Sequence, residues 1–428
     1  MSNSGNKQSY LTSLFLVGCL FSIFGFITWL NGTLITFLKE VCQLNNKQAS
    51  LVTMAFFISY FVMAIPSSFI LRKTGFKNGM SLGLLVMVVG CLVFIPAATQ
   101  RNYNYFLIGL FTQGLGLSIL QTASNPYVTI IGPIEGAAQR ISIMGICNKL
   151  AGFFSPIILG AALLSGMDGL KEQVAKATGT AEKNTILSEM SERIITPYII
   201  LAICLFVVAI LIRFSPLPEI KEDKEENTLS GDTAQRPLWS YTYLFLGALS
   251  IFFYVGVEVL AGDYIISYGS YLGVPMDYAK YLTSLTLAFM LGGYAVGIIL
   301  TPRFISQETL LRLFLLLSLG LIGGVLFTTG KTSVLLLSLL GFTHAIMWPA
   351  IWPMSIKGLG RHTKIGSALL IMGIIGGGVV PYIYSALGDA NGGNLQEPFW
   401  IMIPCYLFIL FFAMWGHKIG YREQADKV

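Results

Sequence analysis

Charged side chains are scarce in this chain of 428 residues. Asp, Glu, Lys and Arg together make up 11% of it, whereas about 25% of an ordinary soluble domain is charged. Hydrophobic residues make up 54%, and the mean hydropathy is +0.71. These apolar residues fall into many separate blocks, so the composition excludes an ordinary soluble domain and a single membrane anchor. It predicts a protein that crosses the membrane several times.

Histidine and cysteine are also few. The three histidines are scattered and the six cysteines show no paired spacing, so neither a metal site nor a disulfide framework is predicted. The glycine groups at 292–293 and 376–378 follow no strand and precede no Walker lysine, which argues against an ATP-driven pump. The net charge of +6 is spread over short loops, as in ordinary membrane proteins, and does not indicate nucleic-acid binding. We therefore expect neither an enzyme nor a cofactor-binding protein.

The apolar blocks define twelve candidate membrane spans, each near the roughly 20 residues that a helix needs to cross a bilayer. Residues 217–236 are dense in charge and separate the sixth span from the seventh. We predict an all-α membrane protein with two pseudo-symmetric six-helix bundles, at 1–214 and 241–428, joined by a cytoplasmic linker at 215–240. The spans lie at about 10–38, 49–71, 78–97, 104–131, 139–164, 196–214, 241–270, 279–300, 309–328, 333–356, 364–386 and 398–416.

Lysine and arginine predict the orientation. They are concentrated in the short loops after even-numbered spans and in the C-terminal tail, and they are sparser in loops after odd-numbered spans. Because cytoplasmic loops of membrane proteins carry an excess of these residues, both termini and the linker are expected in the cytoplasm. The residues concerned are Arg72, Lys73, Lys77, Lys357, Arg361, Lys364, Lys418, Arg422 and Lys427.

The two halves of the chain carry similar motifs. Asn125-Pro126 near the end of the fourth span corresponds to Trp348-Pro349 near the end of the tenth, and a basic loop and a glycine-containing helix follow each. Glycine and proline interrupt the helices of many membrane proteins, which is the alternative explanation. A true duplication would indicate a transporter that binds its substrate near the midplane between the halves.

Four ionisable residues lie inside apolar spans. An ionised side chain in hydrocarbon is costly unless it faces a partner or a watery cavity, so these residues indicate a polar pathway and hence transport. Lys149 lies nine residues after Arg140, or about 13 Å into a core of about 30 Å. We expect it to pair with Glu258, either as a switch or as a static link between two helices. Asp263 is expected to be a gate residue, an ion ligand or a solvated group, and His344 a pore-lining or a core histidine.

The most specific motifs of the chain lie at 121–129 with 132–133, at 254–256 and at 356–360. With the segments 24–32 and 148–152, they resemble the fucose permease-like sugar transporter branch of the major facilitator superfamily, and the resemblance covers essentially the whole chain. This resemblance implies uptake of a monosaccharide of the glucose/galactose, N-acetylglucosamine or fucose type across a bacterial inner membrane, by a protein that works as a monomer. The segments 24–32 and 148–152 are most similar to the N-acetylglucosamine and glucose/galactose members of this branch.

The chemistry of sugars suggests which residues contact the substrate, and by resemblance the four amide candidates occupy cavity or motif positions of the family. Sugar hydroxyls need amides and hydroxyls, and the C–H faces of the ring pack on aromatic side chains. Hydrogen bonds between helices and packing against lipid are the alternative roles. The amide candidates are Asn31, Gln121, Asn125 and Asn148, and the aromatic candidates are Trp29, Tyr127, Tyr254, Trp348 and Trp352.

Ion coupling departs from the family pattern. Fucose permeases carry an Asp directly after the asparagine of the first span and a Glu at the start of the fourth-span motif, both associated with proton coupling. The corresponding residues here are Gly32 and Gln121, which do not titrate. Coupling has therefore moved to Glu258 or Asp263, or the ion is sodium, or the protein is an uncoupled facilitator.

Overall fold

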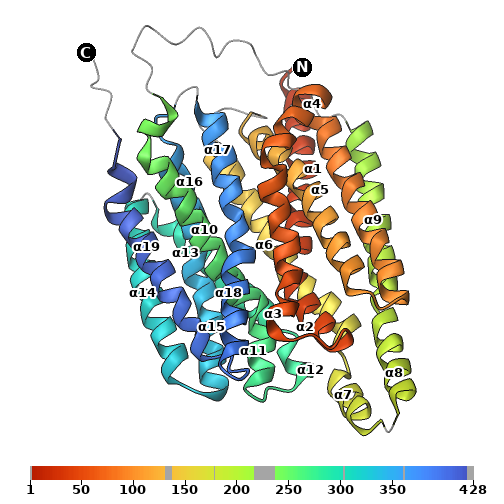
Figure 1. The fold of residues 1–428 in the computed structure, drawn as a ribbon. Helices are drawn as coiled ribbons and strands as arrows, with labels where there is room; N and C mark the ends of the chain where they lie inside the picture. Colours follow the sequence, from red (N-terminus) through yellow and green to blue (C-terminus); the bar gives the residue numbers. More distant parts are fainter. Residues whose placement is uncertain are drawn as a thin grey trace, which may run out of the picture.

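The computed structural model describes residues 2–130, 137–177, 179–215, 237–301, 304–359 and 362–421. Within these ranges the regular structure is entirely helical (Figure 1). Eleven runs of helix are long and apolar enough to span a membrane. One of them, Asn46–Thr99, has 54 residues, or about 80 Å of helix, which is more than twice the roughly 30 Å of a bilayer core. Since this run is long enough for two spans, the described residues hold twelve candidate spans, the number that the sequence predicts.

The N-terminal spans form the bundle coloured red to yellow-green in Figure 1. The first span is interrupted at Trp29 and Leu30. Helix α4 contains two spans and reverses direction between them at Gly75, whose φ of +76° suits glycine because glycine has no Cβ. The helices are α1 (Ser2–Thr28), α2 (Asn31–Val41), α3 (Asn46–Ala49), α4 (Leu51–Thr99), α5 (Tyr103–Ile130), α6 (Ala137–Leu163), α7 (Met167–Lys176), α8 (Thr180–Glu192) and α9 (Ile195–Phe214).

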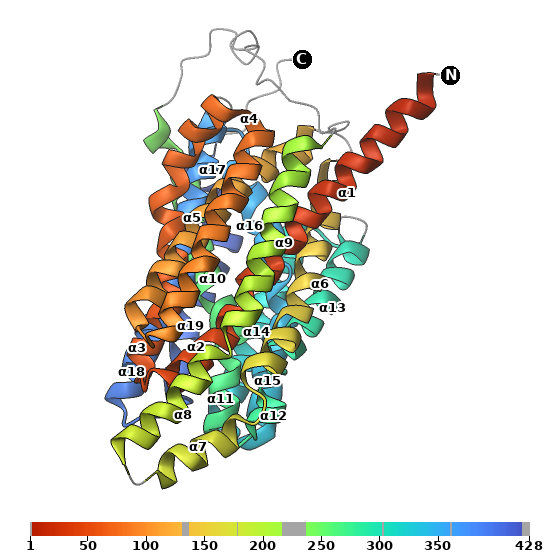
Figure 2. The same cartoon turned by 90° about the vertical axis from the view of Figure 1, so that its right-hand side faces the viewer.

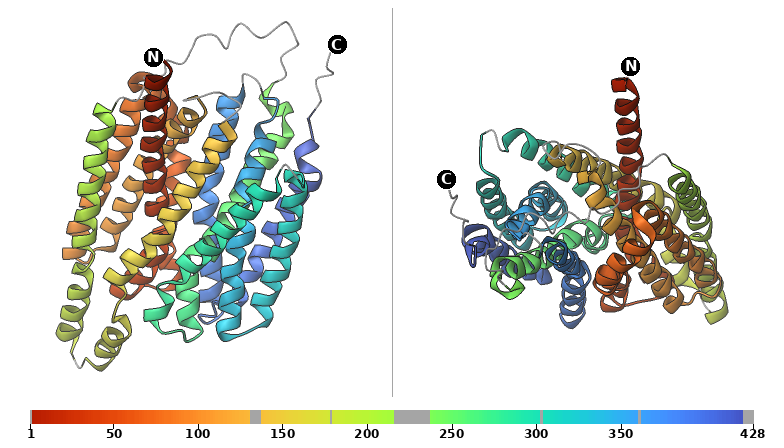
Figure 3. Two further views of the ribbon diagram at one scale, coloured as in Figure 1. Left: turned by 180° about the vertical axis from the view of Figure 1, so that it is seen from behind. Right: turned by 90° about the horizontal axis from the view of Figure 1, so that it is seen from above.

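The C-terminal spans form the green-to-blue bundle beside it, as the view from above in Figure 3 shows. Here the seventh span continues into a short helix, and the tenth and eleventh spans are divided. The helices are α10 (Thr242–Asp263), α11 (Ile265–Tyr271), α12 (Met276–Ala279), α13 (Leu282–Leu300), α14 (Gln307–Phe327), α15 (Gly330–His344), α16 (Met347–Ile356), α17 (Thr363–Met372), a 3-10 turn (Gly373–Ile375), α18 (Gly376–Ala390) and α19 (Met402–Met414).

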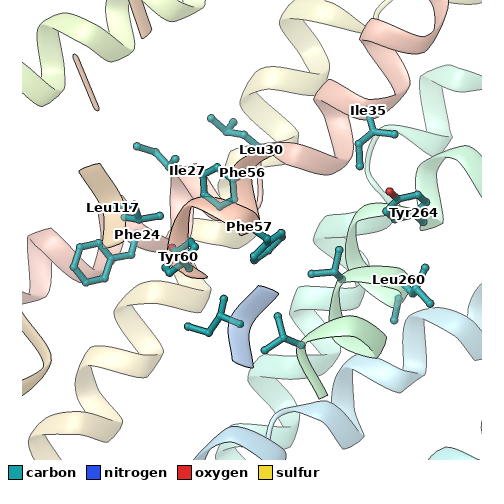
Figure 4. Packing of buried hydrophobic residues seen from close by; sticks show 14 of the residues in the cluster. Phe24, Ile27, Leu30, Ile35, Phe56, Phe57, Tyr60, Leu117, Leu260 and Tyr264 are labelled. Carbon is teal, nitrogen blue, oxygen red and sulfur yellow. The ribbon is translucent and has the colours of Figure 1, made fainter. Parts of the chain in front are cut away.

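The bundles pack against each other through α6 with α13 and through α4 with α17 and α18. We call the end where α1 and α10 begin the terminal end, and the opposite end the distal end. The distal end carries α3, α7, α8, α11 and α12 (Figure 2). Figure 4 shows how the first span brings apolar side chains against α4 and towards α10; it labels Phe24, Ile27, Leu30, Ile35, Phe56, Phe57, Tyr60, Leu117, Leu260 and Tyr264.

Two carboxylates join the bundles at the distal end in a reciprocal way. Asp389 of α18 accepts hydrogen bonds from the backbone N–H of Asn46 (3.2 Å) and of Lys47 (2.7 Å), and from the Asn46 side chain (2.8 Å). Asp168 of α7 accepts from the backbone N–H of Met276 at 2.8 Å. Each bundle thus supplies an acid to the first turn of a four-residue helix in the other. We call these hydrogen bonds the distal contacts.

Candidate functional site

A buried ion pair joins the two bundles near the middle of their interface. The Lys149 Nζ of α6 lies 2.9 Å from the Glu258 Oε1 of α10, and each side chain is 11% exposed. The hydroxyl of Tyr254, one turn earlier on α10, donates to the same oxygen at 2.7 Å. The structure therefore brings together the two charged residues that the sequence suggested as partners. The glutamate has two donors, and its charge is compensated by the lysine.

Trp29 packs beneath this pair. Trp29 lies in the break between α1 and α2. The Lys149 Nζ lies 4.7 Å from the centroid of the Trp29 ring, a distance typical of a cation–π interaction. A Cβ at either Gly152 of α6 or Gly262 of α10 would overlap with the indole, so two glycines make room for the ring. Trp29 is 3% exposed and contacts both bundles. In this arrangement its faces are covered by protein.

Asp263 ends α10 at the bundle interface, and the structure excludes the solvated position that the sequence left open. It is 1% exposed, and its Oδ1 has no hydrogen-bond partner. A Cβ on Gly32 of α2 would lie 2.8 Å from the Asp263 Cα and 3.2 Å from Oδ1. The two backbones therefore touch at this point. Asp263 is five residues beyond Glu258, or about 7.5 Å farther towards the distal end.

The amide candidates are placed differently from one another. Gln121 of α5 donates from Nε2 to the Tyr60 hydroxyl at 3.3 Å and is half-buried. Asn148 of α6 donates from Nδ2 to the Phe21 carbonyl at 3.2 Å, which ties α6 to α1 and fits the alternative of a bond between helices. Asn31 is 1% exposed, and its Nδ2 has no partner. The side chain of Asn125 lies outside the described residues.

Three of the five aromatic candidates form a cluster beside the ion pair. Trp348 and Trp352 of α16 stack with centroids 5.2 Å apart and planes at 25°. The ring of Tyr254, whose hydroxyl donates a hydrogen bond to Glu258, has its centroid 6.3 Å from the ring centroid of Trp348. Both tryptophans are partly exposed and offer ring surface to a ligand. Tyr127 lies elsewhere, against Phe76 at 6.3 Å, and is buried.

His344 is a buried residue of the C-terminal bundle. Its Nε2 is 2.7 Å from the Tyr406 hydroxyl of α19, and its Nδ1 has no partner. The contact with α19 fits a core histidine better than a pore-lining one. In the described ranges no cluster of three or more His, Cys, Asp or Glu side chains is suited to a metal ion.

Two adjoining cavities lie between the bundles near the distal end. The inner one is lined by residues of both bundles, including Tyr264, the neighbour of Asp263, and Ser385. The outer one includes Glu40 and Lys171, whose side chains form an ion pair of 2.8 Å. Both share Lys39 and Ser267 in their linings. Polar side chains thus extend from the distal surface almost to Asp263.

Sequence reasoning missed several residues that shape this site. Gly32, Gly152 and Gly262 hold the interface close, and only their positions beside Trp29 and Asp263 reveal this. The hydrogen bond from Tyr254 to Glu258 had a signal in the spacing of four residues on one helix. Asp168 and Asp389 had none, because their partners are distant in sequence and all but the Asn46 side chain are backbone N–H groups.

The chain is similar over nearly its whole length to known proteins. The model of the Major Facilitator Superfamily matches residues 14–381. A glucose/galactose transporter of Brucella abortus biovar 1 (strain 9-941) is 35% identical over 424 residues, which cover 97% of this chain and 96% of that protein. An L-fucose-proton symporter of Escherichia coli (strain K12) is 28% identical over 416 residues, covering 96% and 94%.

Solved structures agree with this family. The transporter FucP in its outward conformation matches with a TM-score of 0.68 and 27% identity, over 95% of this chain and 98% of that one. The structural match covers both bundles, so it is not limited to a single shared motif.

Proposed function

Because the chain belongs to the Major Facilitator Superfamily, we propose that it is a secondary active transporter that takes up a neutral monosaccharide by cation symport. The observation that carries this proposal is the Lys149–Glu258 pair, buried between two bundles that must move relative to each other for alternating access. Similarity to a glucose/galactose transporter over 97% of the chain supports a sugar as the substrate. N-acetylglucosamine and fucose are the other candidates.

The sugar would bind next to the ion pair, between the amides of the N-terminal bundle and the aromatic rings of the C-terminal bundle. Trp348 and Trp352 offer faces for the C–H side of a pyranose, and Gln121 offers an amide for its hydroxyls. Asn31 has an unpartnered buried amide, which a ligand could satisfy after a change in conformation. Asn125, Asn148, Tyr254 and Trp29 complete the proposed set.

The ion pair would act as the coupling element. A buried Lys–Glu pair is favourable only while both charges are matched, so a proton or a sugar hydroxyl that engages either partner can open it. Tyr254 connects Glu258 to Trp348 in the aromatic cluster, which gives bound sugar a route to the pair. The proton is the preferred ion because a relative 28% identical to this chain is an L-fucose-proton symporter. Sodium is the alternative.

We further propose that both termini and the 215–240 linker lie in the cytoplasm of a bacterium, so that the distal end faces outwards. The basic residues Arg72, Lys73 and Lys77 flank Gly75, where α4 turns. In Figure 1 the turn of α4 lies at the terminal end. The position of these basic residues supports this orientation by the positive-inside rule. The distal contacts would then close the carrier on its outer side. We propose that this carrier functions as a monomer.

Ligand-induced thermal shifts across a panel of monosaccharides test the substrate class, followed by counterflow exchange in proteoliposomes. We expect a neutral hexose or N-acetylhexosamine to stabilise the protein and to exchange across the membrane. Sugar phosphates should do neither, because Lys149 already compensates Glu258 and offers little to a dianion. Exchange of sugar phosphates without exchange of any neutral monosaccharide would refute the proposal.

A further inference from the structure

Two carboxylates of α10 differ sharply in their surroundings. Glu258 accepts hydrogen bonds from Lys149 and Tyr254, so its charge is compensated. Asp263 is more deeply buried, and its Oδ1 has no hydrogen-bond partner. An ionised carboxylate is poorly tolerated without a partner in a dry protein interior, whereas a protonated one is tolerated far better. The surroundings of Asp263 therefore suit the neutral acid.

The groups around Asp263 offer no counter-ion of its own. The hydroxyls of Thr283 and Thr286 on α13 donate to carbonyls of α10, and the Tyr264 hydroxyl lies 3.3 Å from Thr53 of α4. On α2 the contact is the backbone of Gly32, whose N–H is a neutral hydrogen-bond donor to the carboxylate. The neighbours of Gly32, Asn31 and Thr33, are uncharged. The charges that act on Asp263 are those of Glu258 and Lys149, which pair with each other, while His344 on α15 is hydrogen-bonded to Tyr406.

The burial of Asp263 depends on the closed distal end. Gly32 belongs to the N-terminal bundle and Asp263 to the C-terminal bundle, and their backbones touch. If the bundles separate distally, Gly32 moves away and the carboxylate becomes accessible from the cavity that includes Tyr264 and Ser267. Water would then solvate an ionised Asp263. Closure takes this solvation away, so closure and ionisation of Asp263 oppose each other.

We infer that Asp263 is the group that binds the coupled proton from the distal side, and that its protonation permits the distal side to close over Gly32. This inference rests on the proposed symport. It assigns proton binding to Asp263, while the Lys149–Glu258 pair remains the element that couples the bound sugar to the movement of the bundles. A carrier with ionised Asp263 stays open at the distal end. When a proton binds, the neutral acid can be buried against α2 and the distal end closes. Closure encloses the bound substrate, which can then be released on the opposite side of the membrane.

The test is a distance measurement between spin labels on the two bundles. Thr185 of α8 and Tyr278 of α12 are exposed distal positions, one on each bundle, and carry the labels in a cysteine-free background. Pulsed electron spin resonance on the reconstituted full chain, without sugar or ion gradient, gives the populations of near and far distances between pH 5 and pH 9. In the wild type, the near population should rise as the pH falls.

Three variants define the result. Asp263→Asn should favour the near population at every pH, because the amide is neutral throughout. Gly32→Ala should favour the far population at every pH, because the added Cβ would lie 2.8 Å from the Asp263 Cα. Glu397→Gln, which removes an exposed carboxylate from the same bundle, should keep the wild-type pH dependence.

The inference fails if the wild type shows no pH dependence, if Asp263→Asn keeps the wild-type dependence, or if Gly32→Ala closes as the wild type does. Thermal unfolding of each variant identifies any that does not fold. The Gly32→Ala variant tests the closed contact without changing the carboxylate of Asp263. The measurement requires no sugar. A pH-dependent closure in a protein that transports no monosaccharide would thus refute the proposed function, while still showing that protonation of Asp263 controls closure of the distal end.

Discussion

Lys149 and Glu258 make their 2.9 Å contact between the two bundles and not within either one. The pair can therefore exist only in conformations that bring α6 and α10 together at this depth. Trp29 packs against the same lysine and against Gly262 of α10, so a cation, an anion and an aromatic ring meet where the bundles touch. Any change of charge at this point alters the stability of one conformation relative to another.

Removing Lys149 should be strongly destabilising, and a second substitution should partly correct it. Lys149→Ala leaves Glu258 charged, buried and unmatched, which costs about 3–5 kcal/mol. Lys149→Ala combined with Glu258→Gln removes that charge and should recover part of the loss, as measured by thermal unfolding of the purified variants. The exposed pair Glu172 and Lys176 provides the control, because its removal should change stability very little. A double variant no more stable than Lys149→Ala would contradict this account of the pair.

Gly262→Ala should impair transport by displacing Trp29. The new Cβ would overlap with the indole, and relief of such overpacking costs about 1–3 kcal/mol, which would disfavour the closed interface. Initial rates of sugar exchange measure the effect. Gly320→Ala on α14 is the matched control, since a Cβ there meets nothing within 4 Å. Equal exchange rates for the two variants would show that the contact of Trp29 with α10 is not required.

Gln121→Ala and Asn148→Ala should each weaken the apparent affinity for sugar. Loss of an amide that binds a buried ligand group costs about 1–3 kcal/mol, which corresponds to roughly tenfold or more in affinity. Asn148 also donates to the Phe21 carbonyl, so its variant should lose some thermal stability in addition. Binding titrations read together with unfolding curves separate these effects. If both variants bind sugar as tightly as the wild type, the amides serve only to join helices.

Asp389→Ala should open the distal end. It removes the acceptor for three hydrogen bonds from Asn46 and Lys47, and a loss of even about 1.4 kcal/mol from the closed state changes the open-to-closed ratio tenfold. Asp168→Ala should act in the same direction through Met276. The spin-label pair at positions 185 and 278 measures both. An unchanged near population in both variants would show that the distal contacts do not hold the bundles together.

The sequence predicts the spans well because a bilayer imposes a length and a polarity that can be read locally. It also predicts the depth of Lys149, since a helix converts residue number into distance. The burial of Trp29 and Asp263 is different. Both are covered by residues of the opposite bundle, and Gly32 and Gly262 allow this only through a close approach that no local pattern encodes.

The distal contacts were equally hidden from sequence. Asp389 binds backbone N–H groups, which every residue but proline possesses, so nothing in the sequence around Lys47 marks it as a partner. The break at Trp29 and Leu30 also lies in a segment whose hydropathy is continuous. Contacts that depend on the conformation of the whole carrier leave the weakest trace in the sequence.

Uptake into proteoliposomes under an imposed proton gradient tests the central claim most directly. Wild-type protein should concentrate the sugar inside the vesicles while the gradient lasts, with a sodium gradient as the parallel measurement. Glu258→Gln should abolish this accumulation and preserve counterflow exchange, because exchange does not require the empty carrier to return. If Glu258→Gln concentrates sugar as well as the wild type does, the Lys149–Glu258 pair is not the coupling element. If the wild type only equilibrates sugar under both gradients, the protein is a facilitator and not a symporter.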